Sequence, residues 1–187
     1  SMNRIFEVIS TKPTIHDPKD PKHLPAENST ISFNHVSFKY ANAEEDVLDD
    51  INFTAKPGET VAFIGSTGSG KSTLINLLPR FFDVSEGSIM FGDVDSRDLP
   101  QKELRDRIGY IPQKGILFSG TIASNLRYAD ENISDEKIEE ALTISQAKEF
   151  VSRMPKGVDE AISQGGTNVS GGQKQRLSIA RALAKDA

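Results

Sequence analysis

The feature that most constrains this chain is a glycine-rich segment placed between a short apolar run and an amphipathic stretch. Its residues, Gly65, Ser66, Thr67, Gly68, Ser69, Gly70, Lys71, Ser72 and Thr73, match the pattern G-x-x-x-x-G-K-[ST]. Glycines let backbone N–H groups turn inward around an anion, and the following helix directs its positive end at that anion. The lysine ammonium reaches the outer phosphates, and the serine hydroxyl suits a hard Mg²⁺ ion. The segment therefore predicts a nucleotide phosphate site, but this motif alone leaves ATPases, GTPases and kinases open.

The flanking residues predict a strand before the loop and a helix after it. Val61 to Ile64 is a continuous apolar run, which suits a central parallel strand buried on both faces. Ser72 to Leu78 carries Leu and Ile at helical spacing. Ile108 to Ile111, closed by Pro112, reads as a further strand. This order of elements predicts an α/β fold with a parallel core sheet.

Other segments predict an antiparallel part and a helical part. Residues 31–40 and 47–53 alternate apolar and polar side chains, as half-buried antiparallel strands do. Ser88 to Phe91 predicts another strand, and Pro100 opens a short helix over 101–107. Helices are also expected over 134–154, with Ser134 as N-cap, and over 173–185, where the inner face holds Leu177, Ala180 and Ala184.

The first residues differ in composition from the rest. Arg4 to Ile9 could form a short helix, but residues 11–27 hold Pro13, Pro18, Pro21 and Pro25 among charged residues. Prolines exclude a helix interior, so an extended connector is expected. We therefore expect residues 1–28 to be a linker and the domain to begin near Ser29.

Composition and charge argue against several classes of protein. The 187 residues include 22 Lys and Arg against 27 Asp and Glu, a net charge of −5, with no dense basic run. We therefore expect no nucleic acid among the partners. No apolar run approaches the roughly 20 residues that cross a bilayer, so any membrane role should be indirect. The absence of cysteine excludes disulfides and thiolate metal sites.

A second glycine motif points to one family. Residues 168–176 read Asn-Val-Ser-Gly-Gly-Gln-Lys-Gln-Arg, which is similar to the L-S-G-G-Q signature of ATP-binding cassettes, with Val169 in place of leucine. Together with the phosphate motif, the chain resembles the nucleotide-binding domain of ABC transporters over nearly its whole length. Ser170, Gly171, Gly172 and Gln173 offer a hydroxyl, exposed amides and a helix start, which is a second anion cradle.

The resemblance implies roles for further residues. It places an adenine-stacking aromatic at Tyr40 and a second base contact at Val47. Gln113, after Tyr110-Ile111-Pro112, corresponds to a glutamine that ligates Mg²⁺ or positions water, and Lys71 and Gln113 are the implied catalytic residues. In the family, the signature of one protomer closes on ATP held by the other, in a head-to-tail dimer. Residues 118–126 and 164–167 resemble exporter-type cassettes, the latter a loop that touches the membrane domains.

The resemblance also sets the expected architecture. We expect a P-loop NTPase with a parallel core sheet, an N-terminal antiparallel subdomain and a helical signature subdomain. Residues 29–187 should be a partial cassette, divided into a nucleotide-binding part (29–115) and a helical part (116–187). Its parent is expected to be an exporter at the cytoplasmic face of the membrane, with a second cassette and membrane domains as partners. The 187-residue piece itself is expected to be soluble.

Several family elements have no counterpart here. The residues after the signature helix are only Lys185, Asp186 and Ala187. The chain therefore lacks the strand with a Mg²⁺-binding Asp, the water-orienting Glu and the switch His, so the C-terminal part of the core is expected to be missing. Because phosphoryl transfer relies on positioning and charge neutralisation, we expect the piece to bind ATP but hydrolyse it poorly.

Three other functions remain as alternatives. A soluble ABC protein acting on DNA or the ribosome would need basic clusters or a long coiled coil. A nucleotide-dependent dimerisation module would use binding rather than turnover as its signal. A GTPase is the least favoured class, because no N-K-x-D guanine motif occurs and Tyr40 is available for adenine.

Overall fold

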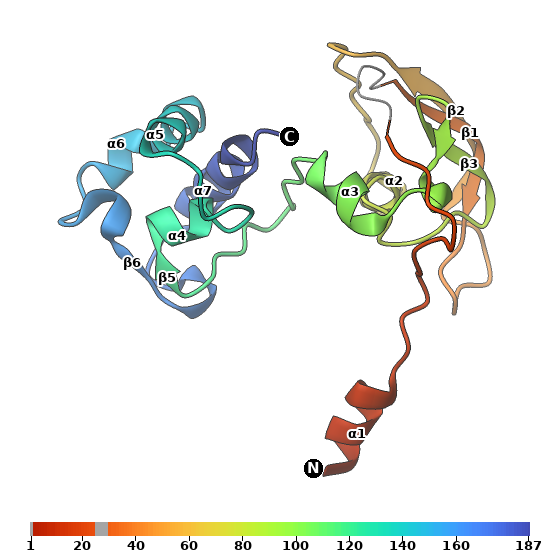
Figure 1. Cartoon of the computed structure of the whole chain (residues 1–187), viewed down its shortest axis with the longest axis horizontal. Helices are drawn as coiled ribbons and strands as arrows, with labels where there is room; N and C mark the ends of the chain where they lie inside the picture. The colour runs from red at the N-terminus through yellow and green to blue at the C-terminus, as the bar shows by residue number, and fades with distance from the viewer. Residues whose placement is uncertain (1, 25–29) are drawn as a thin grey trace. The chain divides into compact units, whose positions relative to one another are not determined.

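The computed structural model describes residues 2–24 and 30–187, leaving aside the side chains of Met2 and Asn3. It divides into two compact units, Ser1–Arg105 and Asp106–Ala187, called here the N-terminal unit and the C-terminal unit (Figure 1). The predicted domain start at Ser29 lies outside the described residues. The elements in chain order are α1 (Met2–Ser10), β1 (Ile31–Phe38), β2 (Leu48–Ala55), α2 (Lys71–Leu77), β3 (Glu86–Phe91), β4 (Val94–Asp95), η1 (Ser96–Asp98), α3 (Gln101–Asp106), β5 (Gly120–Thr121), α4 (Ile122–Leu126), α5 (Asp135–Ile144), α6 (Lys148–Val151), η2 (Gly157–Asp159), β6 (Ala161–Ile162), η3 (Gln164–Gly166) and α7 (Gly171–Ala184).

The N-terminal unit is built on an antiparallel sheet with the strand order β2-β1-β3-β4. Phe33 of β1 lies opposite Phe53 of β2 on one side and Ile89 of β3 on the other. Phe33, Val36 and Ile89 are almost fully buried. Phe33 and Val36 are an odd number of residues apart, and the shift of register between them in the β1–β2 pairing lets both be buried. The antiparallel strands predicted from residues 31–40 and 47–53 are confirmed, and so is the strand predicted over 88–91.

The strands predicted over 61–64, as a parallel strand, and over 108–111 are not formed. Within residues 2–24 and 30–187, no strand pairs with 61–64 or with 108–111, and every ladder is antiparallel. Ile64 is 97% exposed and Ile111 is 43% exposed. A parallel strand needs paired neighbours and covered faces, and the described residues supply neither to these segments. The α/β class is confirmed, whereas the predicted parallel core sheet is absent from the described part of the chain.

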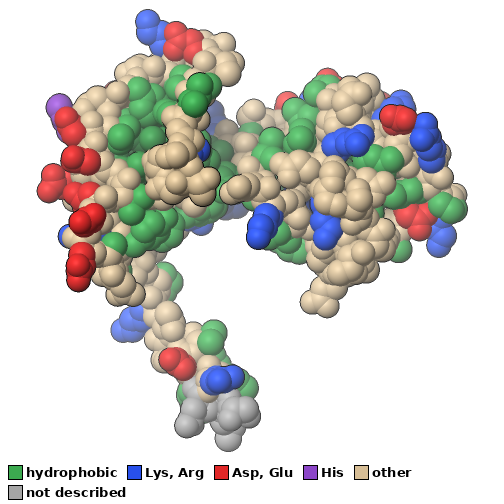
Figure 2. All heavy atoms as spheres, turned by 180° about the vertical axis from the view of Figure 1, so that it is seen from behind, with side chains coloured by type: hydrophobic (Ala, Val, Ile, Leu, Met, Phe, Trp, Pro, Cys, Tyr) green, Lys and Arg blue, Asp and Glu red, His purple; other side chains and the backbone are tan. Residues whose placement is uncertain are grey.

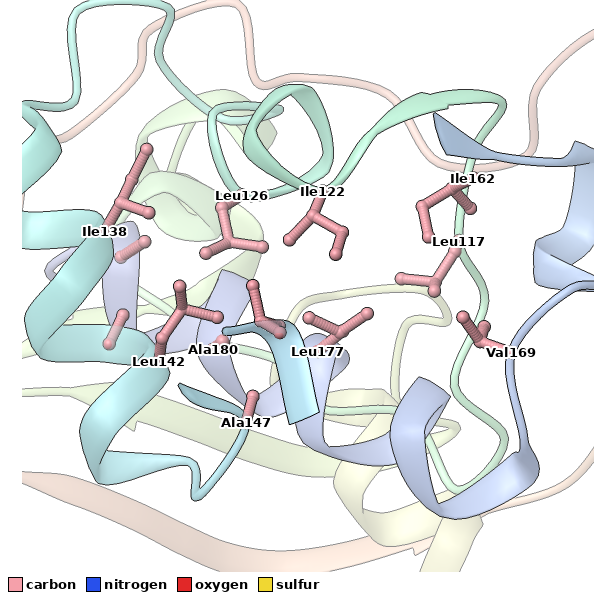
Figure 3. Packing of buried hydrophobic residues seen from close by; sticks show 13 residues of the cluster. Leu117, Ile122, Leu126, Ile138, Leu142, Ala147, Ile162, Val169, Leu177 and Ala180 are labelled. Atoms are coloured by element: carbon pink, nitrogen blue, oxygen red, sulfur yellow. The ribbon is translucent and has the colours of Figure 1, made fainter. Parts of the chain in front are cut away.

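The C-terminal unit packs its helices around one apolar core. Leu177 and Ala180 of α7 meet Leu126 of α4 and Leu142 of α5 in this core (Figure 3). The predicted inner face of the last helix is therefore confirmed. The helix predicted over 134–154 is instead broken, because Gln146 takes a left-handed conformation with φ 59° between α5 and α6.

The residues before the sheet are tied to the N-terminal unit. Residues 11–24 form neither helix nor strand, as their prolines predict. The Asp17 carboxylate accepts a hydrogen bond from the backbone N–H of Gln101 at 2.9 Å, and the Leu24 N–H donates to the Glu103 carboxylate at 2.8 Å. The connector segment 16–24 is thus fastened to α3.

Candidate functional site: a phosphate loop beside an aromatic ring

The predicted phosphate loop enters α2 through two glycines with left-handed backbone. Gly68 has φ 87° and Gly70 has φ 82°, a region that is costly for a residue with a Cβ atom. A Cβ at Gly70 would also lie 2.9 Å from the Val47 carbonyl oxygen and 2.8 Å from the Leu48 Cδ2. A Cβ at Gly68 would meet nothing within 4 Å. Gly70 is therefore required both by its backbone and by the close approach of Val47.

The Lys71 ammonium is held over this loop by neutral oxygen atoms. Its Nζ donates to the carbonyl oxygens of Gly65 at 2.8 Å and Ser66 at 2.6 Å, and to the Ser69 Oγ at 3.0 Å. The loop residues 65–69 are all exposed. An ammonium bonded to neutral acceptors at the surface keeps its full positive charge available to an incoming anion.

Ser72 and Thr73, next along α2, have different surroundings. Thr73 is buried, while Ser72 is exposed beside Lys71. Mg²⁺ prefers oxygen ligands, keeps several waters and usually binds together with phosphates. No group of three His, Cys, Asp or Glu side chains that could hold a metal occurs among the described residues. The exposed Ser72 hydroxyl fits a Mg²⁺ ion that binds together with a nucleotide, rather than one whose ligands all come from the protein.

Tyr40 lies beside the start of α2. Its Oη is 3.0 Å from the Thr73 Oγ1. Phe38 and Phe82 stand nearly perpendicular to the Tyr40 ring, with centroid distances of 4.9 and 5.2 Å. Tyr40 is 36% exposed, which leaves ring surface for a stacked base. The structure thus brings the predicted base residues Tyr40 and Val47 against the phosphate loop.

Gln113 is exposed in the C-terminal unit, at the head of a loop packed against α7. Two residues later, a Cβ at Gly115 would lie 2.8 Å from both the Lys174 carbonyl oxygen and the Ser178 Oγ. The same loop is anchored at its far end, where Asn125 exchanges hydrogen bonds with the backbone of Phe118. The residues that follow Gln113 therefore rest on the signature helix.

The signature residues form the N-terminal end of α7. Ser170 is the N-cap: its Oγ accepts from the Gln173 N–H, and the Gln173 Oε1 accepts from the Ser170 N–H. This reciprocal arrangement is a capping box. Gly171 and Gly172 are exposed, and a Cβ at either would meet nothing within 4 Å. Val169 is buried in the core of the unit (Figure 3), so an apolar residue is what this position requires.

The predicted site residues therefore form two groups. The N-terminal unit unites Tyr40, Val47 and residues 65–73. The C-terminal unit unites the Gln113 loop with residues 170–173 through α7.

Sequence reasoning missed two residues near these groups. Phe82 contacts Tyr40, yet it follows the helix of the phosphate motif with no local pattern to mark it. Arg181 lies over the Phe118 ring at 5.6 Å, beside Tyr128, which stacks on Phe118. Burial lowers the pKa of the Arg181 guanidinium, opposed by the nearby Tyr128. The contacts of Phe82 and Arg181 depend on how the chain folds back on itself, so they are visible only in the tertiary structure.

Fold and site together define a class of protein: an α/β nucleotide-binding domain with a glycine-rich phosphate loop and a second, capped glycine motif. Residues 48–187 match the family described as ABC transporter. The chain belongs to the ABC transporter family, as the sequence analysis predicts.

Relatives and a solved structure agree on the exporter type. The chain is 46% identical over 184 residues to an ABC transporter ATP-binding protein of Bacillus subtilis, covering 98% of this chain and 32% of the relative. It is 41% identical over 187 residues to the ATP-dependent lipid A-core flippase of Desulfotalea psychrophila, covering 100% of this chain and 32% of the flippase. The structure of a bacterial Atm1-family ABC exporter with ATP bound superposes with a TM-score of 0.91 at 33% identity, over 99% of this chain and 32% of the exporter. The chain thus spans about a third of the length of the proteins it matches, and it is similar to ATP-binding domains of exporters.

Proposed function

We propose that this chain is the ATP-binding part of an exporter whose ATP binding and hydrolysis drive transport of a substrate across a membrane. The observation that carries the proposal is the contact between Tyr40 and the start of α2, because it places an aromatic ring beside the predicted triphosphate site. A base on Tyr40 and a phosphate chain at residues 65–73 would occupy one continuous site. Val47 lies at the same place, against Gly70.

Each residue of this site has a chemical role in the proposal. The amides of residues 65–73 and the Lys71 ammonium bind the phosphates, and the Ser72 hydroxyl holds Mg²⁺. When bound, the metal would supply charge neutralisation at the phosphates. Gln113 belongs to the C-terminal unit, and the role that the resemblance implies for it is that its amide oxygen would ligate the metal or position a water.

Lys71 provides the direct test of nucleotide binding. Lys71→Ala should weaken ATP binding by about tenfold or more, because it removes a charge-assisted contact to phosphate. Isothermal titration calorimetry with ATP and Mg²⁺ measures the change. Lys56→Ala, an exposed lysine of the same unit, is the control and should bind ATP normally. Equal affinity in the two variants would contradict the proposal.

We propose further that the signature serves a second copy. Ser170 to Gln173 present open backbone at a capped helix start, which suits an outer phosphate of a nucleotide held by another cassette. Two chains would then bury two ATP molecules head to tail. Light scattering after size-exclusion chromatography should detect a dimer with ATP and Mg²⁺ and a smaller mass without nucleotide.

The parent protein is proposed to carry membrane domains. No helix of the described ranges is both long enough and apolar enough to span a bilayer. The exposed Ile5, Phe6, Val8 and Ile9 of α1, together with the connector, support residues 1–28 as a linker to a membrane domain. Residues 29–115 and 116–187 are the proposed nucleotide-binding and helical parts, on the cytoplasmic face. Figure 2 shows acidic side chains along one border of the N-terminal unit, which does not favour nucleic acid as a partner.

The 187-residue chain alone is proposed to turn over ATP slowly. Its sequence holds no Asp-Glu pair after α7 to complete the metal site and orient water. A phosphate-release assay should give well below about one turnover per second, the lower end of the usual enzyme range. A rate at or above that value would reject this part of the proposal.

A further inference from the structure

The Tyr40 ring is held by three contacts, one of which comes from the first turn of α2 and one from the segment that follows this helix. Thr73, in the first turn of α2, pairs its hydroxyl with the Tyr40 Oη at 3.0 Å. Phe82 follows the turn after α2 and stands at 89° to the Tyr40 ring, with the centroids 5.2 Å apart. The third contact is Phe38, from the end of β1. The chain at Tyr40 itself forms neither helix nor strand.

This arrangement matters because Tyr40 follows the end of a strand. A ring on irregular backbone has rotamer freedom that a stacked base must remove, and this loss weakens binding. Perpendicular aromatic neighbours are a favoured geometry and oppose rotation of the ring between them. The Oη bond to Thr73 fixes the far end of the same ring. The ring is therefore already restricted before a base arrives, while the residue as a whole stays 36% exposed.

We propose that Phe82 and the Thr73 hydroxyl are positioning residues for base stacking, which hold the Tyr40 ring in its base-binding plane and link that plane to the phosphate-loop helix. The inference rests on the proposed function of Tyr40 and extends it to two residues that contact the Tyr40 side chain but would not themselves stack on the base. Phe38 and Phe82 also contact each other, with centroids 5.5 Å apart. The three rings therefore form one cluster, and loss of the Phe82 ring frees one side of Tyr40.

The test separates base binding from phosphate binding. Titration calorimetry of the 187-residue chain with ATP, GTP and inorganic tripolyphosphate, each with Mg²⁺, measures the two contributions. Phe82→Leu should weaken the binding of ATP and of GTP by roughly threefold to tenfold, which is the contribution of one aromatic pair. Its affinity for tripolyphosphate should be unchanged. ATP and GTP should lose affinity equally, because stacking on a ring does not read the edge of a purine. Phe82→Tyr keeps the ring and should restore ATP affinity.

Two further variants make the outcome decisive. Phe53→Leu removes a half-buried ring of the same unit that contacts Phe33 and Phe63 rather than Tyr40, and it should leave all three affinities unchanged. Tyr40→Phe keeps the ring but removes the bond to Thr73, and it should weaken ATP by a factor of about two to five without affecting tripolyphosphate. This second variant tests the inference even if Phe82→Leu does not fold.

The outcomes distinguish the inference from the function on which it rests. The inference is supported if Phe82→Leu loses affinity for ATP and GTP but not for tripolyphosphate, and if Phe82→Tyr restores the affinity for ATP. The inference is overturned if Phe82→Leu and Tyr40→Phe both keep the ATP affinity of the unchanged chain. It is also overturned if both variants lose affinity for ATP and for tripolyphosphate by the same factor. If the unchanged chain binds neither ATP nor tripolyphosphate, the proposed function itself fails.

Discussion

Gly70 shows how a single residue can join two parts of the candidate site. Its positive φ lets the loop turn into α2, and its missing Cβ lets the Val47 carbonyl approach. Gly68 shares the left-handed backbone but has open space around it. The two glycines look equivalent in the motif, yet only one of them connects the loop to the base side of the site.

This difference predicts unequal effects of the same substitution. Gly68→Ala should cost about 1–2 kcal/mol of unfolding free energy from backbone strain alone. Gly70→Ala should cost more, by roughly a further 1–3 kcal/mol, because the new methyl group overlaps Val47 and Leu48. Urea denaturation of both variants measures the costs, and calorimetry with ATP should show the larger loss for Gly70→Ala. Indistinguishable variants would mean that the Val47 contact does not constrain the loop.

At the scale of elements, the C-terminal unit contains two capping boxes that differ in setting. Ser170 and Gln173 cap α7 at the signature, and Thr121 and Ser124 cap α4 inside the same unit. Both satisfy N–H groups at a helix start. Only the capping box of α7 lies at the proposed nucleotide contact. The box of α4 therefore serves as a comparison that has the structural role without the proposed binding role.

Ser170→Ala and Thr121→Ala should therefore have similar effects on stability and different effects on association. Each should lower the unfolding free energy by about 1 kcal/mol, the usual worth of an N-cap. Only Ser170→Ala should also reduce the ATP-dependent dimer seen by light scattering. If Thr121→Ala reduces the dimer to the same extent, the signature cap acts through stability alone.

The contact between the connector segment 16–24 and α3 should depend on pH, because the Asp17 carboxylate is part of it. The Asp17 pKa is below its ordinary value, chiefly because the Gln101 backbone N–H and side chain donate to the carboxylate, with help from the charges of Arg80 and Arg105. A carboxyl group whose pKa is lowered by folding stabilises the folded state above its unfolded value, and that contribution is lost as pH falls through the lowered value. The contact should therefore hold at pH 6 and weaken below about pH 4.

Amide hydrogen exchange at Gln101 measures this change. Protection of its N–H, corrected for intrinsic exchange, should fall between pH 6 and pH 3. Asp17→Asn keeps an acceptor oxygen but no titrating group, so its Gln101 protection should not change with pH. A parallel fall in both proteins would assign the effect to other groups.

At the scale of the whole molecule, several segments expose more than one large apolar side chain. Among these segments are α1 (Ile5, Phe6, Val8 and Ile9), the residues before the phosphate loop (Val61 and Ile64) and those around the Gln113 loop (Ile111, Ile116 and Phe118). Figure 2 shows hydrophobic side chains at the surface of both units. Contiguous exposed apolar groups favour association, and unpaired extended segments add free backbone groups to it.

The isolated chain should therefore associate as its concentration rises, without nucleotide. Size-exclusion chromatography with light scattering should show a mass that increases with loading. Ile64→Ser and Phe6→Ser, on different segments, should identify which surface is responsible, because the responsible variant returns the mass to that of one chain. A monodisperse monomer at all concentrations would contradict the prediction.

Local patterns account for what could be predicted. The glycine-rich loop, the antiparallel strands and the inner face of α7 each depend on residues a few positions apart. Their glycine spacing, alternation and helical period are written directly in the chain. For the same reason the similarity to ABC transporters was recognisable from two short motifs.

The predictions that failed depend on distant residues. Val61 to Ile64 has the composition of a buried strand, but a strand also needs a neighbour to pair with, and composition does not supply one. The break at Gln146 divides a stretch whose apolar spacing is continuous. The contacts of Phe82 with Tyr40 and of Gly115 with α7 were not predicted, because they join residues that are far apart in sequence.

The sequence by itself determined which residue types make up the candidate site: a glycine-rich loop with a lysine, an aromatic residue and a second glycine motif. Only the tertiary structure decided that Thr73 and Phe82 hold the Tyr40 ring, that Val47 lies against Gly70, and that segment 61–64 remains unpaired. The physical reason is range, since motif chemistry depends on neighbours along the chain, whereas packing and strand pairing depend on which distant segments meet.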